Sequence, residues 1–388
     1  MARIRLLTAG LAAGLAAGLL ALAAAVPARA AGPLPAGLFG AQDPSRGGVA
    51  RQALAITALR TAGVLAGTRS YDWLRDQQCA DGGFPTYREP GRPCDPAGED
   101  IVATALAVQA ITAAPAVRTA SDQPERVGRA VAWLRARQRP DGGWPAAPGG
   151  TASDPRATAY AVTGMLAAKA DPGRAYAYLR GVQVGCDGPA AERGSVHGDG
   201  DTTAVAVLAL GRQLLPADPA KHVAAHPVRC AREPAQAAQA GAAYLAATLR
   251  AHGNLLAGDD LEQTCWAIMA LAAAKVDRAE ADEASVTMID RMRRWVRDSA
   301  GRDLPEALAD LILVNHAVGR DPKAYGGVDL VRRLRDTEQG GVTSRDLVSD
   351  RQPKPHTDPG LVGLAAAGLA AVGAAAVVPY TRRRRRSP

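Results

Sequence analysis

Aromatic residues are scarce in this chain of 388 residues. It contains two phenylalanines, eight tyrosines and five tryptophans, although 47% of its residues are hydrophobic. The core must therefore be built mainly of alanine, leucine and valine rather than of rings. Patterns typical of β-strands are nearly absent as well, so the sequence predicts an all-α protein.

An excess of positive charge is missing from the middle of the chain. The net charge is +8, but three positive charges come from Arg3, Arg5 and Arg29, and five come from Arg382–Arg386. The segment between them is therefore close to neutral. A protein that binds nucleic acid needs a basic face, so we expect no nucleic-acid partner.

The N-terminal residues have the pattern of a secretory signal. Arg3 and Arg5 precede an apolar run over residues 6–26, and the small-x-small sequence Ala28-Arg29-Ala30 follows it. Residues 1–30 are therefore predicted to be a signal peptide, which places the protein outside the cytoplasm. We expect a linker over residues 31–47.

A second apolar stretch lies near the C-terminus. Residues 361–378 carry no charge and are long enough to span a bilayer, so a transmembrane helix is predicted over 361–380. The arginines of residues 381–388 should stay in the cytoplasm by the positive-inside rule. The alternative, a buried alanine-rich helix, gives no role to five consecutive arginines. The sequence thus predicts a cell-surface protein anchored in the plasma membrane.

The segment before this stretch, residues 341–360, is polar and contains proline, which is typical of a tether. Its Lys354-Pro355-His356-Thr357-Asp358 resembles a degenerate sortase signal, although the flanking leucine and glycine are absent. Whether a sortase processes this segment stays open, and simple membrane anchoring is the preferred interpretation.

Apolar periodicity and stop signals predict twelve helices in the remaining domain, residues 48–340. Their approximate spans are 49–66, 69–78, 99–114, 124–138, 154–168, 172–184, 201–215, 235–251, 259–274, 283–298, 303–318 and 326–336. Alanine-rich helices alternate with helices that carry tyrosine, tryptophan and arginine. Small side chains suit a closely packed inner ring, and the larger ones suit an outer ring with one solvent-facing side. We therefore expect an (α/α)6 toroid with two concentric rings, with an open solenoid as the alternative.

Four of the alanine-rich helices begin with the same spaced pair, an aspartate followed four residues later by a threonine. The pairs are Asp100 and Thr104, Asp154 and Thr158, Asp199 and Thr203, and Asp260 and Thr264. Recurrence of this kind indicates an array of equivalent units. Because an aspartate can accept hydrogen bonds from the free backbone N–H groups of a helix start, we expect these residues to be N-caps.

A second motif ends two of the outer helices: Gln78-x-x-Asp81-Gly82-Gly83-Phe84 and Gln138-x-x-Asp141-Gly142-Gly143-Trp144. It resembles the repeat motif of the squalene–hopene cyclase and protein prenyltransferase superfamily, whose members fold as α/α toroids. The resemblance implies a structural role, in which the glutamine and the ring join adjacent helices. The glycines would supply positive φ angles after each helix end.

One stretch resembles a catalytic motif of that superfamily. Asp199-Gly200-Asp201-Thr202-Thr203-Ala204 is similar to the Asp-x-Asp-Asp-Thr-Ala of class II terpene and triterpene cyclases, in which the middle carboxylic acid protonates an alkene. The resemblance implies that Asp201, beside Asp199, is the candidate acid. Thr202 replaces the third aspartate of the motif. Glu262 stands at the place of Asp201 in the next repeat, which makes Asp201 and Glu262 the candidate ligand-binding pair.

Zinc-dependent protein prenyltransferases carry a His-Thr-Cys that this chain replaces with Gln263-Thr264-Cys265, so we expect neither a metal nor a cofactor.

Export favours disulfide formation, and Cys79 and Cys94 bracket a Gly/Pro-rich loop that a disulfide would close. The pairing of Cys186, Cys230 and Cys265 stays open.

Two functions from different classes fit these patterns. The favoured one is a non-catalytic surface module that binds a ligand or a partner. The Asp-x-x-x-Thr-Ala-x-Ala helices are also similar to those of the intrinsic factor and transcobalamin family, secreted toroids that bind cobalamin, so a corrinoid or small apolar ligand is expected, with a surface protein as the alternative partner. The other function is a class II terpene cyclase-like enzyme that uses Asp201 as its acid.

Overall fold

The computed structural model describes residues 34–114, 121–215, 228–256, 258 and 260–341. The predicted signal peptide, the tether after residue 341, the transmembrane helix and the arginine tail lie outside these residues. Within the described part, no helix is both long and apolar enough to span a bilayer. Every described helix belongs to the unit Pro35–Pro388.

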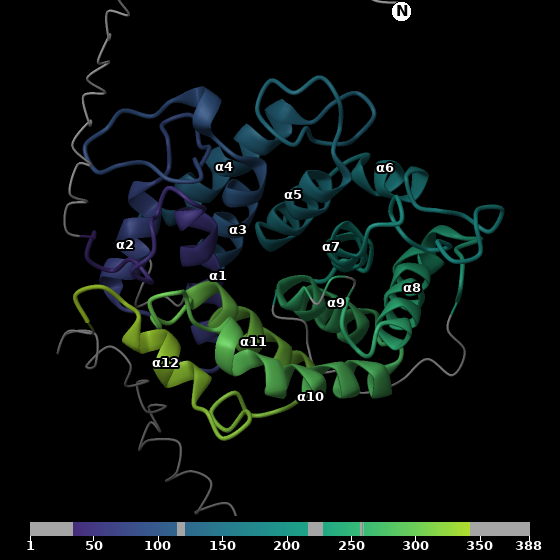
Figure 1. Cartoon of the computed structure of the whole chain (residues 1–388). Coiled ribbons are helices and arrows are strands. Elements are labelled where there is room, and N and C mark those ends of the chain that lie inside the picture. Colours follow the sequence, from purple (N-terminus) through teal and green to yellow (C-terminus); the bar gives the residue numbers. More distant parts are fainter. Residues whose placement is uncertain (1–33, 115–120, 216–227, 257, 259, 342–388) are drawn as a thin grey trace, which may run out of the picture. The chain divides into compact units, whose positions relative to one another are not determined.

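Twelve α-helices and no β-strand occur among the described residues, so the all-α prediction and the helix number are confirmed (Figure 1). Two short 3-10 helices, Pro96–Gly98 and Pro234–Gln236, lie in the connections. The twelve α-helices are α1 (Gly48–Thr61), α2 (Thr68–Asp76), α3 (Ile101–Thr112), α4 (Gln123–Arg137), α5 (Pro155–Ala167), α6 (Ala175–Gly181), α7 (Gly200–Leu210), α8 (Ala237–Ala251), α9 (Leu261–Ala274), α10 (Arg278–Trp295), α11 (Pro305–Val318) and α12 (Leu330–Asp336).

Each of the four repeated aspartates lies at the N-cap of an odd-numbered helix. The side chains of Asp100 and Asp154 accept hydrogen bonds from the N–H groups of Ala103 and Ala157, both at 2.7 Å. Asp199 and Asp260 cap α7 and α9 in the same way. Such a cap satisfies a backbone donor that the helix itself leaves free, and it fixes where the helix begins.

The repeated threonines join each helix to the loop before it. The Oγ1 of Thr158 donates to the N-cap carbonyl of Asp154 at 2.7 Å and accepts from the Trp144 N–H at 2.9 Å. The corresponding hydroxyls accept from the backbone N–H groups of Phe84, Val196 and Leu256. All four threonine side chains are buried, so their hydroxyls supply bonds that water cannot.

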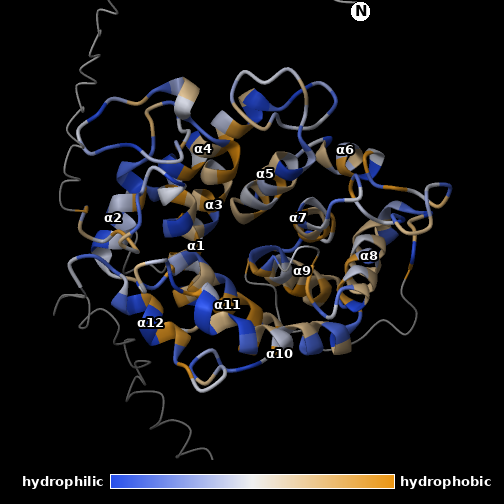
Figure 2. Cartoon of the chain, viewed as in Figure 1, coloured by the Kyte–Doolittle hydropathy of each residue, from blue (hydrophilic) through white to orange (hydrophobic). Residues whose placement is uncertain are grey.

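The odd-numbered helices pack on one another in a closed circuit. Each of α1, α3, α5, α7 and α9 packs against the next odd-numbered helix, and α11 packs against α1 (Figure 1). Small residues allow close approach between them: a Cβ added at Gly164 of α5 would lie 2.7 Å from the Cα of Ala105 in α3. Apolar residues are concentrated in these helices, as Figure 2 shows, and almost all of them are buried.

The even-numbered helices pack against this circuit, each on the odd-numbered helix before it. Among them α2, α4 and α10 are more hydrophilic than the odd-numbered helices (Figure 2), whereas α8 is rich in alanine. In α4, for example, Val131, Trp133 and Leu134 are buried, whereas Glu125 is exposed. One buried side and one solvent-facing side on these helices agree with the alternation in the sequence.

Residues before α1 belong to the packed structure rather than to the expected linker. The N–H of Gly37 donates to Gln339 O, and the N–H of Gln339 donates to Leu38 O, both at 2.8 Å. Leu38 and Phe39 are completely buried. The same pair of bonds closes the turn after α2, between Cys79 and Gly82 and between Cys79 and Gly83. The N-terminal segment therefore supplies the turn that follows α12, and it joins the two ends of the circuit.

We predict that Thr158→Val destabilises the fold by about 1–3 kcal/mol, because it leaves the buried N–H of Trp144 without an acceptor. Urea denaturation measures the change in the free energy of unfolding. The same substitution at Thr287, a partly exposed residue of α10 whose hydroxyl donates to Glu283 O, is the matched control. Equal losses for the two variants would contradict a special role for the repeated threonine.

Candidate functional site

The glutamines of the repeated motif hold the turns to the following outer helix. The Nε2 of Gln138 donates to Gly142 O and to Pro172 O, both at 2.9 Å. Gln78 makes the equivalent bonds to Gly82 O and Arg126 O. Gln183 does the same for a third turn, although that turn lacks the Gly-Gly-aromatic sequence. These contacts give the motif a structural explanation that needs no chemistry.

The other motif residues complete each turn. Asp81 and Asp141 accept from the N–H of the second glycine, at 3.3 and 3.0 Å. Gly82 and Gly142 have φ of 108° and 97°, and a Cβ at either would meet the backbone of the following outer helix within 3 Å. The rings of Phe84 and Trp144 are fully buried. A larger residue at Gly82 or Gly142 would be strained in conformation and in space.

Asp201, the candidate acid, is the second residue of α7 and is paired with a base. Its Oδ2 lies 2.8 Å from the Nε of Arg156, which occupies the corresponding place in α5. Burial raises the pKa of Asp201, while Arg156 acts in the opposite direction. The neighbouring Asp199 is the N-cap and has an exposed side chain. Asp201 is thus a partly buried carboxyl in an ion pair.

The second residue of four successive odd-numbered helices is charged, and these side chains act on one another electrostatically. They are Arg156, Asp201, Glu262 and Glu306. Burial raises the pKa of Glu262, and the negative charges of Asp201, Asp260 and Glu306 raise it further. Protein atoms surround Glu262, but its side chain is still exposed to water. The structure therefore brings Asp201 and Glu262 into electrostatic contact.

A fourth carboxyl lies one helical turn deeper. Asp310 follows Glu306 by four residues in α11, is 2% exposed, and its Oδ1 has no hydrogen-bond partner. Burial, followed by the charges of Glu262 and Glu306, raises the pKa of Asp310 well above its ordinary value. Burial therefore favours the neutral, protonated form of Asp310 over the charged one. Asp310 is not among the candidate residues predicted from the sequence, although an aspartate inside the apolar run Leu308-Ala309-Asp310-Leu311-Ile312 is a usable signal.

Two buried rings accompany these carboxyls. Tyr160 and Trp266 pack edge to face, with ring centroids 5.6 Å apart, and the guanidinium of Arg156 lies 5.5 Å from the centre of the Tyr160 ring. Asp201, Asp310 and Glu262 all act electrostatically on the Tyr160 hydroxyl. We call Asp201, Glu262, Glu306 and Asp310 the central carboxyl cluster. It can hold a proton at Asp310 and can accept hydrogen bonds or positive charge from a ligand.

No set of three or more metal-ligating side chains is arranged around a common point in the described part of the chain. The disulfide expected between Cys79 and Cys94 is confirmed, with Cα atoms 5.7 Å apart. A second disulfide joins Cys186 to Cys230, a pairing that the sequence left open. Cys265 is a buried thiol, and burial raises its pKa. Two disulfides indicate an oxidising compartment.

Comparison with protein-family models and with curated proteins finds no match to this chain.

We predict that Asp310→Asn stabilises the protein at about pH 8 and that the gain shrinks towards about pH 4. The raised pKa means that the folded state keeps a proton that the unfolded state loses, so wild-type stability falls as pH rises above the unfolded pKa. Urea denaturation at several pH values tests this. Asp290→Asn, on an exposed position of α10, is the control. A gain that is independent of pH would contradict the burial of a neutral Asp310.

Proposed function

We propose that this chain is a non-catalytic, extracytoplasmic binding module of the α/α-toroid type. The closed circuit of odd-numbered helices, the outer even-numbered helices and the Gln-x-x-Asp-Gly-Gly turns support a toroid related to the prenyltransferase and squalene-cyclase repeat proteins. The two disulfides and the predicted signal peptide support export. The apolar stretch near the C-terminus would anchor the module at the cell surface, with the arginine tail in the cytoplasm.

The ligand would bind at the N-terminal ends of the odd-numbered helices. The observation that carries this proposal is the unpartnered Oδ1 of Asp310, beneath the carboxyls of Glu262 and Glu306. A buried carboxyl oxygen without a hydrogen-bond partner destabilises the protein unless something supplies one. A ligand that binds at this place can supply the missing partner, which would explain the presence of Asp310.

Charge narrows the class of ligand. The central carboxyl cluster has four carboxyls, and the nearby bases are Arg156 and the buried Arg51, which interacts with Glu306. A ligand with a positive charge or several N–H donors would complement this balance, and an anionic isoprenoid diphosphate would be repelled. A corrinoid, whose amide side chains donate hydrogen bonds, also fits. A surface protein that presents a lysine or arginine is the alternative partner.

A second candidate function is a terpene cyclase-like enzyme with Asp201 as general acid. Burial raises the pKa of Asp201, and the Tyr160 and Trp266 rings lie in the same part of the fold, which favours this candidate. The ion pair with Arg156 acts against it, because an acid catalyst must be protonated. We rank it second for that reason.

Ligand screening of the full-length protein tests the binding function. We expect cyanocobalamin or an amine such as spermidine to raise the thermal midpoint, and we expect Asp310→Asn and Glu262→Gln to weaken that effect by tenfold or more in Kd, about 1.4 kcal/mol. Asp290→Asn should bind as wild type does. Stabilisation that survives both cluster substitutions would place the ligand elsewhere.

Incubation with squalene or geranylgeranyl diphosphate separates the two candidate functions. The binding proposal predicts no product by mass spectrometry. Turnover by the wild type that Asp201→Asn abolishes would establish the enzyme instead.

A further inference from the structure

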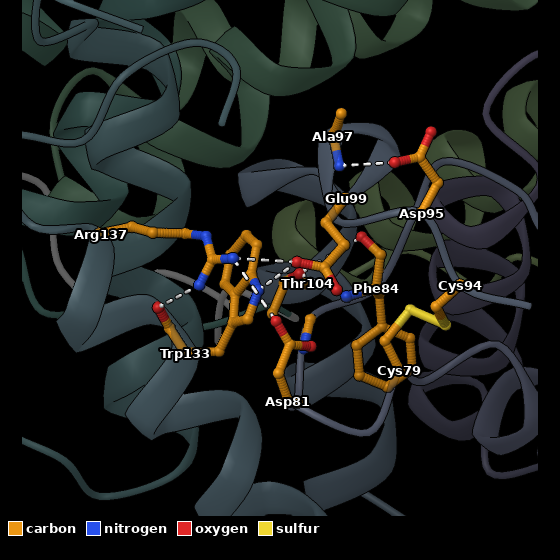
Figure 3. A network of polar contacts seen from close by, with 12 residues as sticks. Cys79, Asp81, Phe84, Cys94, Asp95, Ala97, Glu99, Thr104, Trp133 and Arg137 are labelled. Atoms are coloured by element: carbon orange, nitrogen blue, oxygen red, sulfur yellow. Dashed lines mark hydrogen bonds and ion pairs between the residues drawn. A yellow bond between two sulfur atoms is a disulfide. The ribbon is translucent and has the colours of Figure 1, made fainter. Parts of the chain in front are cut away.

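Glu99 lies in a buried polar cluster with Asp81, Trp133 and Arg137 (Figure 3). Its side chain has no exposed surface and lies between two residues of α4. The Nε1 of Trp133 donates to Glu99 Oε2 at 2.5 Å, and the Nη2 of Arg137 donates to the same oxygen at 3.1 Å. The Arg137 guanidinium also lies over the Trp133 ring, 3.8 Å from its centre.

A second carboxyl shares the same arginine. The Nη2 of Arg137 lies 3.5 Å from Asp81 Oδ2, on the first motif turn (Figure 3). Glu99 Oε1 is buried and has no hydrogen-bond partner. Two ionised carboxylates would therefore compete for one base, with one oxygen left unpaired. A proton on Glu99 relieves this competition, because the protonated carboxyl becomes a hydrogen-bond donor to Asp81.

The second motif turn shows the same arrangement with a different donor. Ser153 precedes the N-cap Asp154, as Glu99 precedes the N-cap Asp100. The Ser153 hydroxyl donates to Asp141 Oδ1 at 2.8 Å. Asp141 corresponds to Asp81 in the motif. The chain thus places a donor opposite the motif aspartate in both copies, but Glu99 can donate only while it is protonated.

Glu99 lies where the loop closed by the Cys79–Cys94 disulfide meets α4. Glu99 follows the 3-10 helix Pro96–Gly98 and directly precedes the N-cap of α3, and the Cys79–Cys94 disulfide closes the loop on the other side. Trp133 and Arg137 belong to α4. A Cβ at Gly83 would lie 2.6 Å from Glu99 Cδ, so the turn packs directly on the carboxyl. Glu99 therefore joins the disulfide-closed loop to the next outer helix.

We propose that Glu99 and Asp81 form a proton-binding pair that holds the disulfide-closed loop on α4 while one proton is shared, and loosens this contact when the proton passes to solvent. In the described part of the chain, the charged groups that act on Glu99 are Asp81 on the turn and Arg137 on α4. No redox step or further reactant is involved.

The Glu99–Asp81 pair is expected to gain or lose its proton near neutral pH. Burial, and next the hydrogen bond and charge of Asp81, raise the pKa of Glu99 to about 7, while Trp133 and Arg137 act in the opposite direction. The folded pKa lies above the unfolded one, so the folded state holds the extra proton between the two values. The stabilising contact is present at low pH and is lost as pH rises through about 7.

The indole N–H signal of Trp133 in a nitrogen-15 NMR titration of the full-length protein tests the proposal. This N–H bonds to Glu99, so we expect its chemical shift to titrate with a midpoint near 7. Trp133→Phe assigns the signal. The indole N–H of Trp144 bonds to the backbone carbonyl of Leu134 and provides an internal control whose shift should stay constant.

Three variants separate a proton-binding pair from a merely buried acid. Glu99→Gln and Glu99→Ser should abolish the titration, because each replaces the carboxyl with a group that does not titrate. Each also keeps a permanent hydrogen-bond donor opposite Asp81. Asp81→Asn should move the midpoint to lower pH, because it removes the neighbouring charge. A Trp133 signal that does not move between about pH 5 and about pH 9, or that titrates alike in wild type and Glu99→Gln, overturns the proposal. An unshifted midpoint in Asp81→Asn also overturns it.

Discussion

The fold depends on one buried hydroxyl that is repeated four times. In each unit a threonine donates to the carbonyl of the N-cap residue and accepts from the backbone N–H at the end of the preceding loop, as Thr158 does between Asp154 and Trp144. The aspartate fixes where the helix starts, and the threonine fixes how the previous turn meets it. Because both act through backbone atoms, the surrounding side chains can vary between units.

This repeated geometry places the central carboxyl cluster. When helices begin in register around a closed circuit, residues just after the N-cap face a common centre. Arg156, Asp201 and Glu262 therefore meet although they are far apart in sequence, and Glu306 joins them from α11. Asp310, one turn deeper, takes its raised pKa from burial and from its carboxyl neighbours in that assembly. A constraint that serves folding thus creates the electrostatics of the candidate site.

The features that could be predicted from the sequence are those set by residues close together in the chain. The twelve helices, the Asp-x-x-x-Thr starts and the disulfide between Cys79 and Cys94 follow from spacing and compartment. The role of residues 35–39 could not be predicted, because Gly37 and Phe39 complete a turn whose other half lies at Glu338 and Gln339, and a circuit closes only in three dimensions. Asp310 and Glu99 were missed for a related reason: their raised pKa values come from burial and from groups distant in sequence, such as Glu262 and Asp81.

The protonation state of Asp310 tests the central claim most directly. Carbon-13 NMR of the aspartate side-chain carboxyls at neutral pH reports it residue by residue. The account predicts one signal at the chemical shift of a protonated carboxyl, absent from Asp310→Asn and sensitive to Glu262→Gln, since Glu262 contributes to the raised pKa. An Asp310 signal that titrates in the ordinary range of an exposed aspartate would contradict the account.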